Sequence, residues 1–221
     1  MTEKIPTVNK DNLHKQDYYL NVLEKMGVEV EDKNCRLWLS QKQRDWAFEL
    51  IEKHANNKKY LIAINPLSNW PPKDWPIYNF IELLSLLKEK LSSVKFFLTS
   101  KNKAKEFTPL IEMHKDVLVD LSSNTTLLEL AGLYEKMDLV ISGDSGPLHL
   151  AAAVNTKYLG LYGPTNPFLT GVRAKPKGKI IFENKSCPTP CYIKECEKDY
   201  LCMNIITPDK VSETALKLLK G

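Results

Sequence analysis

The chain has 221 residues, of which 43% are hydrophobic and 26% are charged, a balance typical of soluble globular proteins. No apolar run approaches the roughly 20 residues that a membrane-spanning helix needs, and the polar start MTEKIPTVNKDNLHKQD lacks the apolar core of a secretory signal. We therefore expect a cytoplasmic protein. The net charge of +4 does not favour nucleic acid as a partner, but it permits an acidic ligand or peripheral contact with the inner face of an inner membrane.

The first 59 residues carry helical patterns. In residues 13–26 apolar side chains recur about one helical turn apart, and Gly27 closes the segment. A second helix is predicted over residues 40–54, where a serine provides a good N-cap. We expect residues 1–59 to form a helical hinge, the remnant of another domain, in front of a separate domain over residues 60–221.

From residue 60 onward, strand and helix patterns alternate. The expected strands cover residues 60–65, 95–99, 117–121, 139–141, 157–162 and 179–182. The expected helices cover residues 77–91, 103–114, 126–136, 148–154 and 208–219. Strands that alternate with helices of this length form βαβ units and a parallel sheet. The predicted fold is a Rossmann-like, doubly wound α/β domain, whose ligands bind at the carboxyl ends of the strands.

The loop after the first strand, NPLSNWPPKDWP, carries the first group of candidate site residues. It offers the hydroxyl of Ser68 and the cation Lys73, with Trp70 and Trp75 as rigid walls held by four prolines. A lysine beside a hydroxyl suits a diphosphate, which it meets as a point charge. We expect Lys73→Ala to weaken diphosphate binding without loss of thermal stability. The alternative is that Lys73 is a solvated surface lysine and that Trp75 only anchors the next helix.

A second polar turn, SGDSGP, follows the strand at residues 139–141. Free amides at a helix N-terminus attract phosphate, so we expect the amides of Ser145 and Gly146 to bind one. A positive φ and close backbone approach are expected at Gly146, so that Gly146→Val would disturb both fold and binding. Asp144 would repel a diphosphate unless a cation intervenes, and binding a sugar hydroxyl is its expected role. His149, one helical turn on, either reaches the ligand or is a structural histidine.

The end of the chain is rich in cysteine. Four thiols follow the pattern C-x3-C-x4-C-x5-C, at Cys187, Cys191, Cys196 and Cys202. The paired C-x2-C knuckles typical of zinc sites are missing. We expect no metal and a compact loop with reduced thiols; a four-thiolate metal site is the alternative.

The two polar loops together resemble those of glycosyltransferase family 9, the ADP-heptose:lipopolysaccharide heptosyltransferases. NPLSNWPPKDWP is similar to the family's NPG, Thr or Ser, K-x-W-P pattern, and DSGPLHLAA with YGPTNP is similar to its D-S/T-G-x-x-H and F-G-P-T-x-P patterns. The resemblance covers roughly residues 60–221 and includes the cysteine-rich tail. The sequence departs from the family at Leu67, where a glycine is usual, and at residues 100–106, where Glu106 is the carboxylate that remains of an acidic segment.

The resemblance implies the C-terminal, nucleotide-sugar domain of a GT-B fold, which binds an ADP-sugar, expected to be ADP-heptose, for inverting transfer to a lipopolysaccharide-type acceptor without a cofactor. It implies that Lys73 contacts the diphosphate with Ser68 nearby, that Asp144 lies beside the sugar, and that Ser145 and Gly146 bind phosphate. The family takes its catalytic base from an N-terminal domain. We expect this chain to lack that domain, to bind a donor without turnover, and to have a separate N-terminal-half chain as a candidate partner.

Two other interpretations remain open. The first is a non-catalytic module that binds a nucleotide or a nucleotide sugar. The second is an unrelated doubly wound protein whose glycine turns are only structural.

Overall fold

The structure is a computed structural model of the chain, and it describes residues 12–173, 178–185 and 187–220. In this part of the chain six parallel strands form one sheet in the order β3-β2-β1-β4-β5-β6. The strands are β1 (Tyr60–Asn65), β2 (Val94–Leu98), β3 (Leu118–Asp120), β4 (Leu139–Gly143), β5 (Tyr158–Tyr162) and β6 (Gly178–Phe182). The chain thus runs outward from β1 to one edge, returns to β4 and runs outward to the other edge. The predicted doubly wound fold is confirmed.

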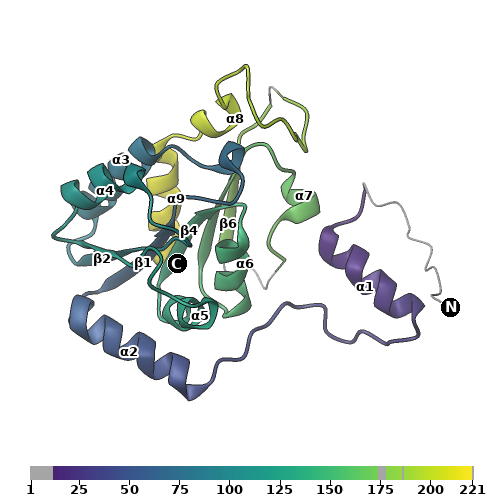
Figure 1. Cartoon of the computed structure of the whole chain (residues 1–221), viewed down its shortest axis with the longest axis horizontal. Helices are drawn as coiled ribbons and strands as arrows, with labels where there is room; N and C mark the ends of the chain where they lie inside the picture. The colour runs from purple at the N-terminus through teal and green to yellow at the C-terminus, as the bar shows by residue number, and fades with distance from the viewer. Residues whose placement is uncertain (1–11, 174–177, 186, 221) are drawn as a thin grey trace.

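Helices cover both faces of the sheet (Figure 1). One face carries α3 (Ile77–Lys90), α4 (Thr108–Met113) and α9 (Pro208–Lys220), and the other carries α2 (Gln41–Ala55), α5 (Leu127–Glu135) and α6 (Gly146–Ala153). Two hydrophobic clusters result, because successive side chains of a strand point to opposite faces. In β1, for example, Ile62 and Ile64 belong to one cluster and Ala63 to the other.

The helix expected over residues 103–114 is divided in two. A short 3-10 helix, Lys105–Phe107, precedes α4, which begins at Thr108 with Pro109 in its first turn. Proline lacks an amide donor and fixes its own φ, so it starts a helix more readily than it continues one. Two short helices, α7 (Pro167–Thr170) and α8 (Leu201–Asn204), lie in segments for which no helix was predicted.

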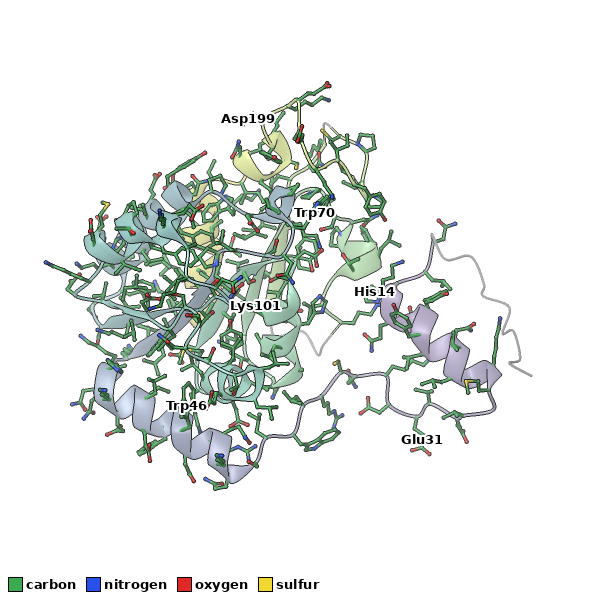
Figure 2. All side chains as sticks on the ribbon, in the orientation of Figure 1. His14, Glu31, Trp46, Trp70, Lys101 and Asp199 are labelled. Atoms are coloured by element: carbon green, nitrogen blue, oxygen red, sulfur yellow. The ribbon has the colours of Figure 1, made fainter. Side chains whose placement is uncertain are left out.

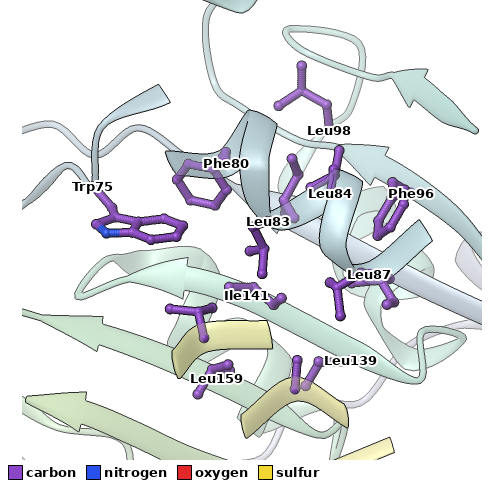
Figure 3. Packing of buried hydrophobic residues seen from close by; sticks show 14 of the residues in the cluster. Trp75, Phe80, Leu83, Leu84, Leu87, Phe96, Leu98, Leu139, Ile141 and Leu159 are labelled. Carbon is purple, nitrogen blue, oxygen red and sulfur yellow. The ribbon is translucent and has the colours of Figure 1, made fainter. Parts of the chain in front are cut away.

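Trp75 belongs to the hydrophobic core (Figure 3). Its side chain is 1% exposed, and its ring meets that of Phe80 edge-on at a centroid distance of 4.9 Å. The indole Nε1–H donates to the carbonyl of Ile206 at 2.8 Å. Trp75 is therefore not a wall of the ligand site, and the alternative, that it anchors the next helix, is correct, because its ring packs on Phe80 of α3.

The segment before the sheet contains α1 (Lys15–Lys25) and α2, as predicted, joined by an extended stretch. Helix α2 packs against α5, where Arg44 pairs with Glu135 at 2.9 Å. Helix α1 lies beside α7, apart from the layered body (Figure 1). None of the helices in the described ranges is long and apolar enough to cross a membrane.

Candidate functional site

A cavity of about 580 Å³ lies at the carboxyl ends of the central strands. Its lining comes from the end of β1 and the loop after it (Asn65, Leu67–Trp70 and Lys73), the loop after β2 (Ser100–Asn102), the start of α5, and the turn after β4 with the start of α6 (Asp144–Pro147). Strands β1 and β4 are neighbours, but their following helices, α3 and α6, lie on opposite faces of the sheet. The loops diverge at this switch point and leave a crevice, the general ligand position in open α/β sheets. Trp70 and Lys101 mark its two sides in Figure 2.

Lys73 and Asp144 form an ion pair in this cavity. The Lys73 Nζ donates to Asp144 Oδ2 at 2.8 Å and lies 3.3 Å from the carbonyl oxygen of the same residue. The side chains are 23% and 6% exposed, and the ammonium lies 5.8 Å from the centre of the Trp70 ring. Lys73 is therefore not a solvated surface lysine, and the cation that the sequence analysis required beside Asp144 is Lys73 itself.

Asp144 is ionised throughout the physiological pH range. Burial by itself raises the pKa of this carboxyl. The interaction with His149, the hydrogen bond from Lys73 and the positive charge of Lys73 together outweigh burial and hold the pKa far below its usual range. His149 Nε2 lies 3.9 Å from Oδ1, too far for a hydrogen bond, so we attribute the larger part of the effect to Lys73 at 2.8 Å. His149 is 44% exposed and is not among the residues that line the cavity.

Further hydroxyls surround Asp144. Thr170 Oγ1, at the end of α7, lies 3.4 Å from Oδ2 and 3.3 Å from the Asn166 carbonyl, and can donate to either. The hydroxyls of Tyr162 and Thr165 are buried near the same carboxylate, and neither makes a well-formed hydrogen bond within the described part of the chain. Burial and the nearby Asp144 charge both raise the pKa of the Tyr162 phenol, so it stays protonated. Because a carboxylate has about four acceptor positions, Asp144 retains capacity for a ligand hydroxyl beside its Lys73 bond.

Ser68, Ser145 and Gly146 also line the cavity, as the sequence predicted. The Ser68 hydroxyl closes its own loop, because it donates to the Trp70 carbonyl at 2.8 Å and accepts from the Trp70 amide at 3.1 Å. Ser145 is the N-cap of α6, and Gly146 opens the helix. The first amides of a helix have no intrahelical acceptor, so these two residues can offer N–H groups to an anion.

The sequence-based expectation for Gly146 needs correction. Among the described glycines, Gly27 has a positive φ and Gly146 does not. A Cβ added to Gly146 would meet nothing within 4 Å. The tighter of the two glycines in this turn is Gly143, where a Cβ would lie 3.1 Å from the carbonyl oxygen of Lys73. Gly143 thus permits the close approach of the Lys73 loop to the end of β4.

We expect Gly143→Ala to lower the free energy of unfolding by about 1–3 kcal/mol, because the added carbon displaces the Lys73 loop. Gly146→Ala, the matched control, should leave it unchanged within about 0.5 kcal/mol. Urea denaturation of both variants and the wild type measures the difference. Equal destabilisation by the two substitutions would contradict the assignment.

The structure adds cavity residues to which the sequence analysis gave no role in binding. Asn65 is 3% exposed and donates from Nδ2 to the Thr99 carbonyl at 2.7 Å. Ser100, Lys101 and Asn102 contribute no carboxylate, and Glu106 lies beyond them in the 3-10 helix. These loops could have been suspected from their position after predicted strands, but which strands are neighbours cannot be read from the sequence.

The cysteine-rich loop lies over the turn after β5, where the Cys191 amide donates to the Pro164 carbonyl at 2.7 Å. The four thiols are unpaired and partly exposed. Burial and the three other thiols raise the pKa of Cys202. Among the described residues, no group of three or more His, Cys, Asp or Glu side chains is arranged to hold a metal ion.

Sequence comparison identifies relatives along most of the chain. The sequence model of glycosyltransferase family 9 (heptosyltransferase) matches residues 7–201. A lipopolysaccharide core heptosyltransferase of Haemophilus influenzae is 28% identical over 158 residues, which are 71% of this chain and 44% of that protein. Lipooligosaccharide heptosyltransferase 2 of Campylobacter jejuni is 28% identical over 170 residues, 75% of this chain and 53% of that protein. The chain spans about half the length of these curated relatives.

Solved structures share the fold. The glycosyl transferase family 9 protein of Veillonella parvula superposes with a TM-score of 0.77 at 22% identity, over 100% of this chain and 64% of that one. ADP-heptose lps heptosyltransferase II of E. coli gives a TM-score of 0.75 at 20% identity, over 96% and 64% of the two chains.

Proposed function

This chain belongs to glycosyltransferase family 9, and from that premise we propose that the switch-point cavity binds the nucleoside diphosphate of a sugar nucleotide. The observation that carries the proposal is the Lys73–Asp144 pair, in which a cation and a carboxylate lie 2.8 Å apart in the cavity. A sugar diphosphate presents an anion followed by hydroxyls, the complement of this arrangement.

Each predicted residue that lines the cavity has a role in this proposal; His149, which does not line it, has none. Lys73 and the amides of Ser145 and Gly146 bind the diphosphate and stabilise the negative charge that develops on it when the sugar leaves. Asp144 accepts a hydrogen bond from a sugar hydroxyl, and Lys73 offsets its repulsion of the phosphates. Ser68 shapes the loop that holds Lys73.

The donor is proposed to be ADP-heptose and the acceptor a glycan of the lipopolysaccharide core, reached by peripheral contact with the cytoplasmic side of a membrane. The names of the Haemophilus, Campylobacter and E. coli relatives support this choice. Inverting transfer also needs a general base for the acceptor hydroxyl. Asp144 is a poor base because its pKa is far below neutrality, so we propose that a second, acceptor-binding domain or chain provides the base.

Binding without transfer is the second candidate function. It is favoured by the charged groups that line the described cavity, which are Lys73, Lys101 and the strongly acidic Asp144. Asp144, the carboxylate among them, is a weak base for a hydroxyl because its pKa is held far below neutrality.

Calorimetric titration with ADP, UDP and GDP, each free and as a sugar conjugate, tests the proposal. We expect ADP-heptose to bind more tightly than ADP, and both to bind more tightly than AMP, because the second phosphate meets Lys73. Failure of every nucleoside diphosphate to bind at low salt would refute the donor site. A transfer assay with a lipopolysaccharide-core acceptor then separates the two candidate functions, since a binding module shows affinity without turnover.

A further inference from the structure

Helix α1 contacts the segment next to Asp144, although the two are far apart in the sequence. His14, the N-cap of α1, and Gly171, which follows α7, are 157 residues apart. Figure 2 shows His14 at the end of α1 that faces α7. The contact therefore links α1 to the segment after α7, whose neighbour Thr170 lies next to Asp144.

His14 makes two hydrogen bonds that together define its protonation. The side chain is 7% exposed. Its Nδ1 accepts from the Gln16 amide at 3.2 Å, so Nε2 carries the proton and donates to the Gly171 carbonyl at 2.8 Å. An imidazolium has two donors and no acceptor, so only the neutral ring serves both partners. An ion pair between Asp17 and Arg173 adds a second contact one turn further along α1.

The segment that His14 holds leads directly to Asp144. The Gly171 amide closes α7 on the Pro167 carbonyl at 2.8 Å, and a Cβ at Gly171 would clash with that carbonyl, so the turn is tight. Thr170, the preceding residue, shares its one hydroxyl proton between Asp144 Oδ2 at 3.4 Å and the Asn166 carbonyl at 3.3 Å. The Asp144 oxygen also accepts from Lys73 at 2.8 Å. The position of Gly171 therefore bears on the hydrogen bonding of the Lys73–Asp144 pair.

We propose that His14 is a positioning residue: in its neutral form it docks α1 on Gly171 and thereby keeps Thr170 hydrogen-bonded to Asp144. The consequence for donor affinity rests on the proposed function, whereas the consequence for the order of α7 does not. Because coupling between two binding events is reciprocal, a ligand that needs Thr170 in place strengthens the docking of α1.

The docking should depend on pH. The charged and titratable groups that face His14 are Arg173 after α7, Asp17 on α1 and His149 on α6. Burial, assisted by Arg173 and His149, lowers the pKa of His14 against the opposing effects of Gly171 and Asp17. The docked pKa is thus below the value of about 6.5 that a free histidine has. Above the pKa of free histidine, His14 is neutral whether α1 is docked or not, and docking has its full strength. As the pH falls from that value toward the lower pKa of docked His14, protonation of the undocked form weakens docking.

Hydrogen exchange of the intact chain, read at the amides of Leu169, Thr170 and Gly171, tests the proposal. All three amides bond within or next to α7. At pH 7.5 we expect His14→Ala to speed their exchange about tenfold, the equivalent of one hydrogen bond, while amides of β1 and β4 keep wild-type protection. In wild type, after correction for intrinsic rates, the same three amides should lose protection at pH 5.5.

His14→Gln is the rescue variant, because glutamine keeps a neutral donor and acceptor and does not titrate. It should restore protection at pH 7.5 and remove the loss at pH 5.5. His54→Gln, on α2, is the matched control and should change neither result. Unchanged exchange in His14→Ala, or the same loss at pH 5.5 in wild type and His14→Gln, would overturn the proposal.

A binding arm separates this inference from the proposed function. If ADP binds wild type, we expect weaker binding to His14→Ala and near-normal binding to His14→Gln. If ADP binds none of the proteins, the donor-site proposal fails, and the exchange data still decide whether His14 positions α7.

Discussion

Replacing Asp144 by asparagine is expected to remove the preference for a sugar nucleotide over the free nucleoside diphosphate. The carboxylate repels phosphates but accepts a charge-assisted hydrogen bond from a hydroxyl, and such a bond contributes about 1.5–3 kcal/mol. In Asp144→Asn, Lys73 loses its counter-ion at 2.8 Å and is freed for the diphosphate. We expect unchanged or tighter binding of ADP and weaker binding of ADP-heptose, both measured by calorimetry. A preserved affinity ratio would show that Asp144 does not contact the sugar.

The same substitution has a second readout in the pH dependence of stability. The folded-state pKa of Asp144 is depressed, so its contribution to the free energy of unfolding is complete above the unfolded value of about 3.9 and is lost as the pH falls further. Urea denaturation between pH 6 and pH 2 should therefore show a shallower acid loss in Asp144→Asn than in wild type. Parallel curves would contradict the depressed pKa.

Replacing Lys73 by alanine is expected to weaken ADP and ADP-heptose alike, by about 1.5–3 kcal/mol, because both lose the charge-assisted contact to the diphosphate. The structure corrects the expectation that stability is unaffected. Removing Lys73 leaves the 6%-exposed Asp144 without its cation. Breaking a fully buried pair costs about 3–5 kcal/mol, and the partial exposure of Lys73 reduces our expected loss to about 1–2 kcal/mol.

Lys88→Ala is the matched control for that variant. Lys88 also pairs with an aspartate, Asp116, at 2.6 Å, but both side chains are about half exposed, and exposed pairs contribute about 0–1 kcal/mol. Lys88→Ala should change neither nucleotide affinity nor stability appreciably.

For Lys73→Ala, an ADP affinity equal to that of wild type at several salt concentrations would exclude the diphosphate role of Lys73.

The elements of the sheet domain were predictable because their signals are local. The apolar run of β1, the turn residues after it and the helical period of α3 each lie within a short window, and the strand predicted over residues 60–65 has those bounds in the structure. The helices that were predicted wrongly or missed are explained by a proline and by short length. Pro109 starts a helix where a continuous one was expected, and α7 and α8 are too short to carry a period.

The candidate site was predictable as a set of residues and not as an arrangement. Ser68, Lys73, Asp144, Ser145 and Gly146 line the cavity, because loops at the carboxyl ends of neighbouring parallel strands meet at one edge, whereas His149, also predicted, does not line it. The roles within the set depend on which side chains face each other. Trp75 and Trp70 look alike in the sequence, yet one is in the core and the other is at the cavity.

The sequence by itself determined the alternation of strands and helices, the class of fold and the two polar loops, since each depends on neighbours along the chain. The tertiary structure decided that Lys73 neutralises Asp144 71 residues away, that Gly143 rather than Gly146 has a close neighbour, and that His14 reaches Gly171. These contacts follow from the strand order and from the docking of α1. Both are set by the packing of surfaces distant in sequence, for which residue spacing carries no signal.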